Sequence, residues 1–109
     1  MILHDEVLTD ACVDATDVFG EGQIGLCMEE CAELIQALSK YQRLKKGQPV
    51  LNKTADEVRE NVIEEMGDVL IMLQQLQLLL SIGDHEILWS MKKKAKRLNF
   101  LTRTMEEKE

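Results

Sequence analysis

The sequence predicts an all-α fold in a single domain, and three features of its composition support that prediction. The chain has 109 residues, the length of one domain, and its 45% hydrophobic content is enough for a core. Aromatic residues make up only 4%, which is unfavourable for a β-sandwich. Pro49 is the single proline, and the abundant Leu, Met, Ala, Glu, Lys and Gln are suited to long helices.

Turn residues delimit the first two of four expected helices. A weakly periodic, acidic segment at about 3–19 predicts the first helix, so residues 1–21 are expected to form an N-terminal helix and loop. The second helix is expected over about 23–46, because Gly47-Gln48-Pro49 is a helix-terminating sequence.

Capping residues mark the last two helices. Thr54 is suited to an N-cap, and Glu57 supplies the second half of a capping box. The third helix is therefore expected from Thr54 to about Ile82. A fourth helix is expected from Asp84 to about residue 105, and residues 106–109 are expected to fray. Together the four helices predict a four-helix-bundle-like domain over residues 1–109.

Charge and apolar content exclude two classes of partner. Thirteen basic and twenty acidic residues give a net charge of −7, which disfavours binding to duplex nucleic acid. The most apolar stretch, residues 69–80, is too short to span a bilayer, and the N-terminus lacks the pattern of a signal peptide. We therefore expect no membrane partner and a cytoplasmic location.

The three cysteines, Cys12, Cys27 and Cys31, do not have the spacing of a metal finger. Cys27 and Cys31 lie one helical turn apart on an apolar stripe, where a small hydrophobic residue fits. Buried thiols are expected, with a redox or metal role as the alternative.

Apolar stripes predict the core-facing sides of the two central helices. In the second helix the stripe consists of Cys27, Cys31, Leu34 and Leu38. A second apolar strip beside it consists of Ile24, Met28 and Ile35. In the third helix the stripe consists of Val62, Met66, Val69, Leu73, Leu76 and Leu80. The second half of the third helix is apolar on nearly every face, which one small bundle can hardly cover. We therefore expect oligomerisation, as a homodimer or homotetramer, to complete the bundle.

Two pairs of carboxylates flank these stripes. Glu30 and Glu33 are three residues apart in the second helix, and Glu65 and Asp68 repeat that spacing in the third. Residues three apart are neighbours on a helix surface. If the two helices are antiparallel neighbours, all four carboxylates converge across the groove between them.

Converging carboxylates are unfavourable without a compensating charge, and a hard divalent cation supplies it. Oxygen ligands suit Mg²⁺, with Mn²⁺ as a possible substitute. Gly67, between Glu65 and Asp68, is costly inside a helix, and close approach of another helix or a ligand would account for it. The alternative is that the acids form an ordinary solvated surface.

Other catalytic arrangements lack their required residues. A di-iron bundle needs two Glu-x-x-His motifs, and neither His4 nor His85 follows a glutamate by three positions. The sequence contains no phosphate-binding Gly-x-x-x-x-Gly-Lys loop. Two histidines so placed also indicate no Ser-His-Asp or Cys-His site.

Residues 28–38 and 63–73 resemble the MazG family, which are all-α nucleoside triphosphate pyrophosphohydrolases. The family signature is Glu-x-x-Glu on one helix and Glu-x-x-Asp on the next. The resemblance extends over roughly residues 22–97, and small single-domain members are the most similar. The residues that match the signature are Glu30, Glu33, Glu65 and Asp68.

The resemblance implies hydrolysis of a (deoxy)nucleoside triphosphate to the monophosphate and pyrophosphate, with a role in nucleotide-pool house-cleaning. Residues 22–105 would then hold the catalytic helices, and the four matching carboxylates would bind Mg²⁺. Glu64 or Glu29 is the candidate for a general base or a supporting role.

Four further residues are candidates for substrate binding. Asn61, one turn before Glu65, could hydrogen-bond the sugar or base, or it could be an ordinary surface amide. Lys94 and Arg97 resemble a Lys-x-x-Arg late in related sequences, and Lys40 is a further candidate for neutralising the phosphates. The alternative function is a non-catalytic helical oligomer that binds a partner or regulates it.

Overall fold

The computed structural model describes residues 5–108, which form four helices and no strand. The all-α prediction is confirmed. Residues 1–4, which include the start of the predicted first helix, and residue 109 lie outside the described part. In chain order the helices are α1 Glu6–Phe19, α2 Gly22–Lys45, α3 Ala55–Leu80 and α4 Asp84–Lys108.

Local side-chain contacts explain where the helices begin and end. The Asp5 carboxylate accepts the first amides of α1 and caps it. The predicted capping box of α3 is confirmed, with both Thr54–Glu57 hydrogen bonds at 3.2 Å. The helix ends slightly earlier than predicted, because Ser81 adopts a left-handed conformation at φ 55°. α4 extends to Lys108, beyond the predicted end near residue 105.

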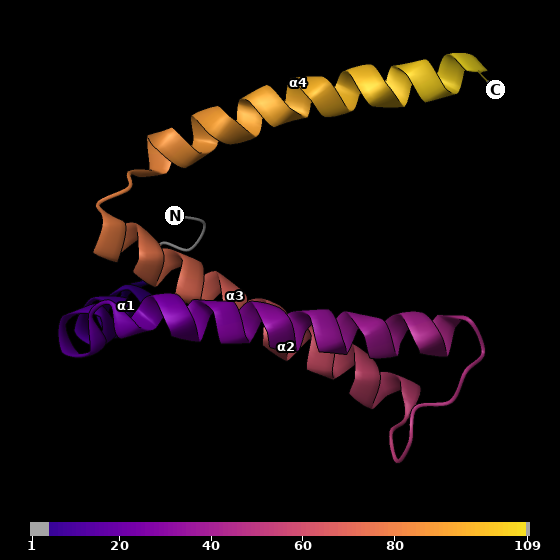
Figure 1. Ribbon diagram of the computed structural model, residues 1–109, viewed down its shortest axis with the longest axis horizontal. Coiled ribbons are helices and arrows are strands. Elements are labelled where there is room, and N and C mark those ends of the chain that lie inside the picture. Colours follow the sequence, from indigo (N-terminus) through magenta and orange to yellow (C-terminus); the bar gives the residue numbers. More distant parts are fainter. Residues whose placement is uncertain (1–4, 109) are drawn as a thin grey trace.

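Three of the helices pack together and the fourth stands apart (Figure 1). α2 and α3 form an antiparallel pair, and α1 packs mainly against α3. Among the described residues, α4 packs against none of the other helices and meets α3 only at the turn between them, so a closed four-helix bundle does not form within one chain. None of the four helices, as far as the structure describes them, combines the length and apolar character needed to cross a bilayer.

The core is small. Its buried apolar residues are Cys12, Cys27, Ala37, Val58 and Met72. Two of the three cysteines are thus buried as predicted, and burial raises the pKa of the Cys12 and Cys27 thiols, which keeps them protonated and unreactive.

Much of the predicted core is uncovered, which corrects the apolar-stripe prediction. Met66, Leu73 and Leu80 on α3 are all more than one-third exposed, as is Leu38 on α2. The second strip of α2 (Ile24, Met28 and Ile35) is also exposed. The other members of the α3 stripe, Val62, Val69 and Leu76, are half-buried, because they lie toward the same side of the helix as the buried Val58 and Met72.

Candidate functional site

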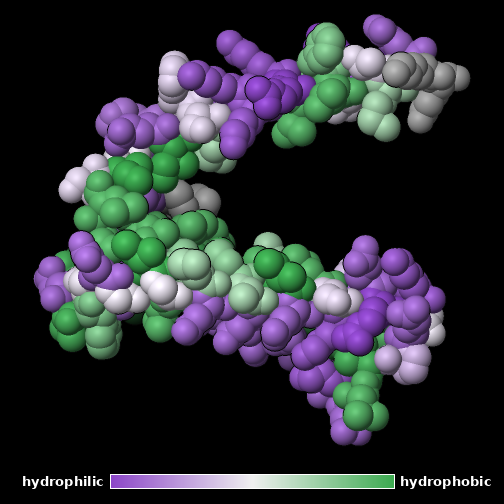
Figure 2. Space-filling view, viewed as in Figure 1, coloured by the Kyte–Doolittle hydropathy of each residue, from purple (hydrophilic) through white to green (hydrophobic). Residues whose placement is uncertain are grey.

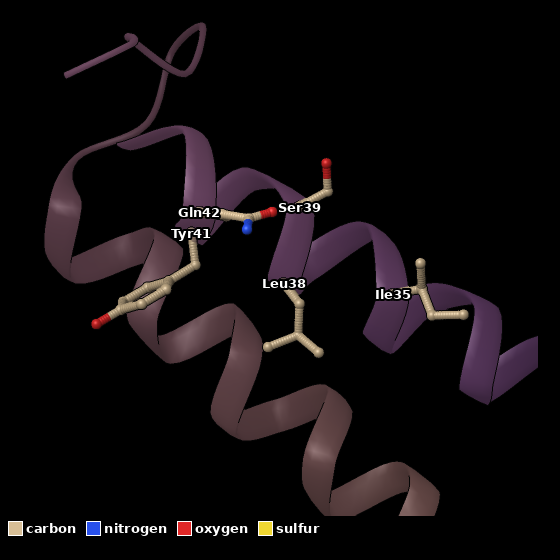
Figure 3. A pocket seen from close by; sticks show the side chains of 5 residues that line it. All are labelled: Ile35, Leu38, Ser39, Tyr41 and Gln42. Carbon is tan, nitrogen blue, oxygen red and sulfur yellow. The ribbon is translucent and has the colours of Figure 1, made fainter. Parts of the chain in front are cut away.

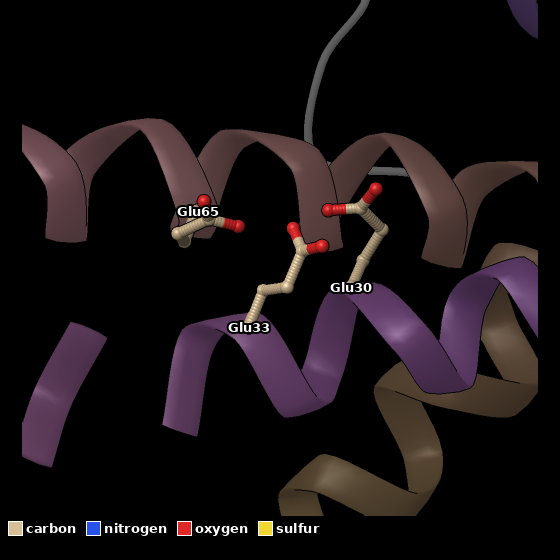
Figure 4. Close-up of side chains that lie close together, drawn as sticks. All are labelled: Glu30, Glu33 and Glu65. Atoms are coloured by element: carbon tan, nitrogen blue, oxygen red, sulfur yellow. The ribbon is translucent and has the colours of Figure 1, made fainter. Parts of the chain in front are cut away.

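Three of the four predicted metal ligands converge between α2 and α3. Glu30, Glu33 and Glu65 each offer one carboxylate oxygen, and these oxygens all lie within 4.8 Å of one another. Figure 4 shows Glu30 and Glu33 extending from α2 toward Glu65 on α3. We call these three residues the carboxylate cluster.

The helix register explains the convergence. Val58, Glu65 and Met72 follow one another at seven-residue intervals, which is close to two turns, so they share the side of α3 that faces inward. Val58 and Met72 are buried. Glu65 therefore lies between two buried apolar residues, and the antiparallel α2 presents Glu30 and Glu33 to it from one face.

Two oxygens of the cluster have no partner. The Oε2 atoms of Glu30 and Glu65 are buried and make no hydrogen bond to the described part of the chain. Orphaned buried oxygens are uncommon in folded proteins, and carboxylate oxygens are the most costly kind. Both oxygen atoms are thus free to coordinate a cation or to accept a hydrogen bond from a ligand.

The electrostatic environment of the cluster favours protonation or a bound cation. Desolvation, and then the negative charges of Glu33 and Asp68, raise the pKa of Glu30 above its ordinary value. The same three causes, in the same order, raise the pKa of Glu65. Desolvation is the largest cause in both cases, so the site is electrostatically strained through burial as well as through repulsion.

Asp68, the fourth predicted ligand, lies at the edge of the cluster. Its side chain is exposed, and it is not among the three carboxylates that share the 4.8 Å separation. Its charge still acts on both Glu30 and Glu65. The structure therefore brings together three of the predicted ligands and places the fourth beside them.

The other residues predicted to take part in catalysis or substrate binding differ in their exposure to solvent. Asn61 and Lys40 are half-buried. Glu64 is exposed and, with Glu60 and Ile63, lines an open hollow of about 310 Å³.

Lys94 and Arg97 are exposed on α4. Because α4 packs along none of the other described helices, the fold of one chain does not bring these two residues to the cluster.

Gly67 has no neighbour that explains a glycine. A Cβ atom at this position would meet nothing within 4 Å in the described structure. The close approach that the sequence suggested is therefore not made within the chain.

Two features were not predicted from the sequence. An open groove of about 470 Å³ follows α2 beyond the cluster; Figure 3 shows the side chains that line it, Ile35, Leu38, Ser39, Tyr41 and Gln42. Gln77 is buried, and its amide donates to Asp84 Oδ1 at 2.8 Å and to the Ile82 carbonyl at 3.4 Å. A glutamine inside an apolar run was the only sequence signal for this second feature.

Comparison with known proteins gives no further guidance. The chain matches no protein-family profile, no curated protein sequence and no solved structure. The functional argument therefore depends on the carboxylate cluster and on the resemblance of its motifs.

Proposed function

We propose that this protein is a MazG-like enzyme that uses Mg²⁺ to hydrolyse a (deoxy)nucleoside triphosphate to the monophosphate and pyrophosphate. The observation that carries the proposal is the carboxylate cluster, in which two of the three side chains keep a buried oxygen without a partner. Solvated surface acids would be free to move apart, whereas these are held together by two packed helices.

The residues of the cluster fit a hard divalent cation. All three donors are carboxylate oxygens, the ligand type that Mg²⁺ and Mn²⁺ prefer. Glu30, Glu33 and Glu65 would hold the ion, and Asp68 would add charge from the edge. When bound, such a cation neutralises charge on the phosphates and lowers the pKa of a coordinated water.

The chain's own residues divide the remaining work. Water attacks the phosphorus of the α-phosphate, a new P–O bond forms, and the bond to the bridging oxygen breaks to release pyrophosphate. Glu64 is the proposed base for the water's proton, because its charge acts on the adjacent Glu65 and its side chain is open to solvent. Asn61 is half-buried one turn before Glu65, where it could orient the sugar or base.

The basic candidates and the assembly belong to the same proposal. Lys40 is the basic candidate within the three packed helices, whereas Lys94 and Arg97 would reach phosphates only after α4 docks on a surface. A homodimer or homotetramer would supply that surface and cover the exposed apolar residues of α3. A role in nucleotide-pool house-cleaning in the cytoplasm completes the proposal.

The test is a panel of normal and modified (deoxy)nucleoside triphosphates, incubated with the full chain and Mg²⁺ and assayed for pyrophosphate. Release is expected for at least one substrate and should stop with EDTA. Glu65→Gln should abolish it because a ligand charge is lost. Glu60→Gln, an exposed acid on the same helix, is the matched control and should leave the rate within about 2-fold.

The same variants separate the enzyme from a non-catalytic oligomer. If no nucleotide releases pyrophosphate and neither Mg²⁺ nor Mn²⁺ binds, the enzyme proposal is wrong and the partner-binding module remains. The extended, exposed α4 is the observation that favours that second function.

A further inference from the structure

α4 carries a strongly basic segment in a chain whose net charge is −7. Residues 87–105 contain six basic side chains and no acidic one, whereas residues 5–83 contain 15 acidic and 6 basic side chains. Figure 1 shows α4 as a separate arm, and Figure 2 shows hydrophilic side chains over much of it. Salt screens charges from one another beyond about 10 Å, so a separate arm can present a positive surface although the whole chain is acidic.

Four of these basic side chains share one side of α4 with two aromatic rings. At 3.6 residues per turn, the six side chains fall within about 100° of one another around the helix. They are Trp89, Lys92, Lys93, Lys96, Phe100 and Arg103. All six are exposed, including the indole at 63% and the phenyl ring at 69%. We call these six residues the aromatic–basic stripe.

A cation–π contact orients the first ring of the stripe. The Lys93 ammonium lies over the Trp89 indole, 3.4 Å from the ring centroid and one turn further along the helix. The lysine covers one face of the ring, and most of the tryptophan stays open to solvent. A flat ring held beside a cation can stack on a planar group with its free face while the neighbouring lysine pairs with an anion.

The large aliphatic side chains in the middle of α4 lie on the opposite side of the helix. Their centre is about 170° from that of the stripe. Those residues are Ile87, Met91, Leu98, Leu101 and Met105. A surface that covers the aliphatic side, whether a protein or a lipid bilayer, therefore leaves the stripe facing water. Lys94 and Arg97 lie outside the stripe, so it uses none of the candidates for substrate binding.

A ligand of the stripe must match cations and rings that follow one another along the helix. Trp89 and Phe100 are 11 residues apart, which is about 16 Å along the axis, and three lysines of the stripe lie between them. A single-stranded nucleic acid offers anionic phosphates together with unpaired bases that stack on aromatic side chains. At 3.4 Å per stacked nucleotide, about five nucleotides span the two rings.

Other anionic partners match the stripe less well. The bases of a duplex are paired and stacked on one another, so their flat faces are not free for the rings. An anionic bilayer would take up the aliphatic side of α4 and leave Trp89 and Phe100 in water. The carboxylates of an acidic peptide supply charge without a planar group to stack. Charge and ring placement together therefore favour a single strand.

We propose that the aromatic–basic stripe of α4 binds single-stranded nucleic acid, with phosphates on its four cations and bases stacked on Trp89 and Phe100. Phosphate contacts and stacking carry little sequence information, so the binding should be tolerant of base sequence. This inference concerns α4 and does not depend on the proposed catalytic activity.

The first test uses only the wild-type full chain, so it does not depend on the folding of a variant. Trp89 is the single tryptophan, and its fluorescence therefore reports on the stripe directly. Oligothymidylate of about 15 nucleotides, titrated at low salt, should quench this fluorescence saturably. The logarithm of the affinity should fall with the logarithm of the salt concentration with a slope of about −3, since each of four neutralised phosphates contributes about −0.7. A duplex of equal length should bind at least about 5-fold more weakly, because it offers no free base to stack.

Variants then separate stacking from charge, with the anisotropy of a fluorescein-labelled oligothymidylate as the readout. Trp89→Ala should weaken binding at least about 5-fold and leave the salt slope unchanged, which is the loss expected from one stacked base. Lys96→Gln should make the slope shallower by about 0.7, because one phosphate contact is lost. Met91→Ala is the matched control: its side chain is exposed on the opposite side of α4, so the affinity should stay within about 2-fold.

Four results would each overturn the proposal. They are the absence of quenching at low salt, a duplex that binds as tightly as the single strand, an affinity unchanged by Trp89→Ala, and tighter binding to vesicles of anionic phospholipid than to the strand. The last result, if Met91→Ala weakened it, would assign α4 to a membrane surface instead.

Discussion

Adding Mg²⁺ to the metal-free protein should raise its unfolding temperature, and removing one ligand should abolish most of that gain. Three carboxylate oxygens within 4.8 Å, two of the side chains bearing an orphaned oxygen, form a site that the unfolded chain does not possess. A ligand that binds only the folded state stabilises it by mass action. Glu30→Gln is the informative change, because it keeps the shape of the side chain and removes its charge.

The size of the effect follows from the binding equilibrium. At a free Mg²⁺ concentration of 100 times the dissociation constant, stabilisation is about 2.7 kcal/mol. For a domain of about 100 residues this corresponds to a rise of roughly 10–20 °C in Tm. Loss of one ligand should weaken binding by at least about 10-fold, since even residues that only support a metal ligand are commonly worth that much.

Differential scanning fluorimetry across a Mg²⁺ titration measures both quantities. Wild type and Glu60→Gln should shift together, whereas the Glu30→Gln curve should move to at least about 10-fold higher Mg²⁺. Sodium chloride at equal ionic strength controls for general screening of the acidic chain. A shift that is equal in all three proteins, or that sodium chloride reproduces at equal ionic strength, would refute a specific site at the cluster.

Three other outcomes are expected. Because the pKa values of Glu30 and Glu65 are raised in the folded state, the metal-free protein should become more stable as the pH falls from neutral toward 4.5, the ordinary pKa of a glutamate. Urea unfolding measures this stability, and Mg²⁺ should weaken its dependence on pH. A stability that only falls on acidification would contradict the prediction. Thr54→Ala should lower stability by about 1 kcal/mol in urea unfolding and leave Mg²⁺ affinity unchanged, with Thr54→Ser as the control. Gly67→Ala should raise stability by about 0.5–1 kcal/mol, because the added Cβ meets open space; a loss would indicate a neighbour from another chain.

The local features of the fold could be predicted from the sequence because they depend on neighbouring residues. The Thr54–Glu57 capping box and the end of α2 before Gly47 are determined within a few positions. The left-handed Ser81 could not be predicted, because no glycine marks it and the helix could have continued into Ile82. The hydrogen bonds that Gln77 makes across the turn to Ile82 and Asp84 likewise could not be predicted, because nothing in the apolar run around Gln77 marks its partners.

The candidate site was predictable in its members but not in its burial. The three-residue spacing places Glu30 with Glu33 on α2 and Glu65 with Asp68 on α3. Antiparallel packing of the two helices brings the first three carboxylates together and leaves Asp68 beside them. The rotation of α3 about its axis determines which of its sides faces α2. An amphipathic pattern determines this rotation only if other helices of the same chain can bury the apolar stripe. Here Glu65 lies between the buried Val58 and Met72, while Met66 and Leu80 stay exposed.

The two proposals predict separate responses to charge. α3 turns Glu65 inward, which gathers charge that needs compensation, and leaves Met66, Leu73 and Leu80 exposed. A cation compensates the charge at the carboxylate cluster alone, so its effect should survive in the Trp89→Ala variant. The aromatic–basic stripe lies on a helix that packs along none of the others that the structure describes, and high salt should weaken its binding to a single strand most. Mg²⁺ also screens the strand itself, so the informative comparison is the strand affinity with and without Mg²⁺ in wild type and in Glu30→Gln. If a bound strand reaches the cluster, its phosphates and the cation attract each other, and Mg²⁺ should favour strand binding more in wild type than in Glu30→Gln. If the strand contacts only α4, Mg²⁺ should act equally on both proteins, as expected for separated sites.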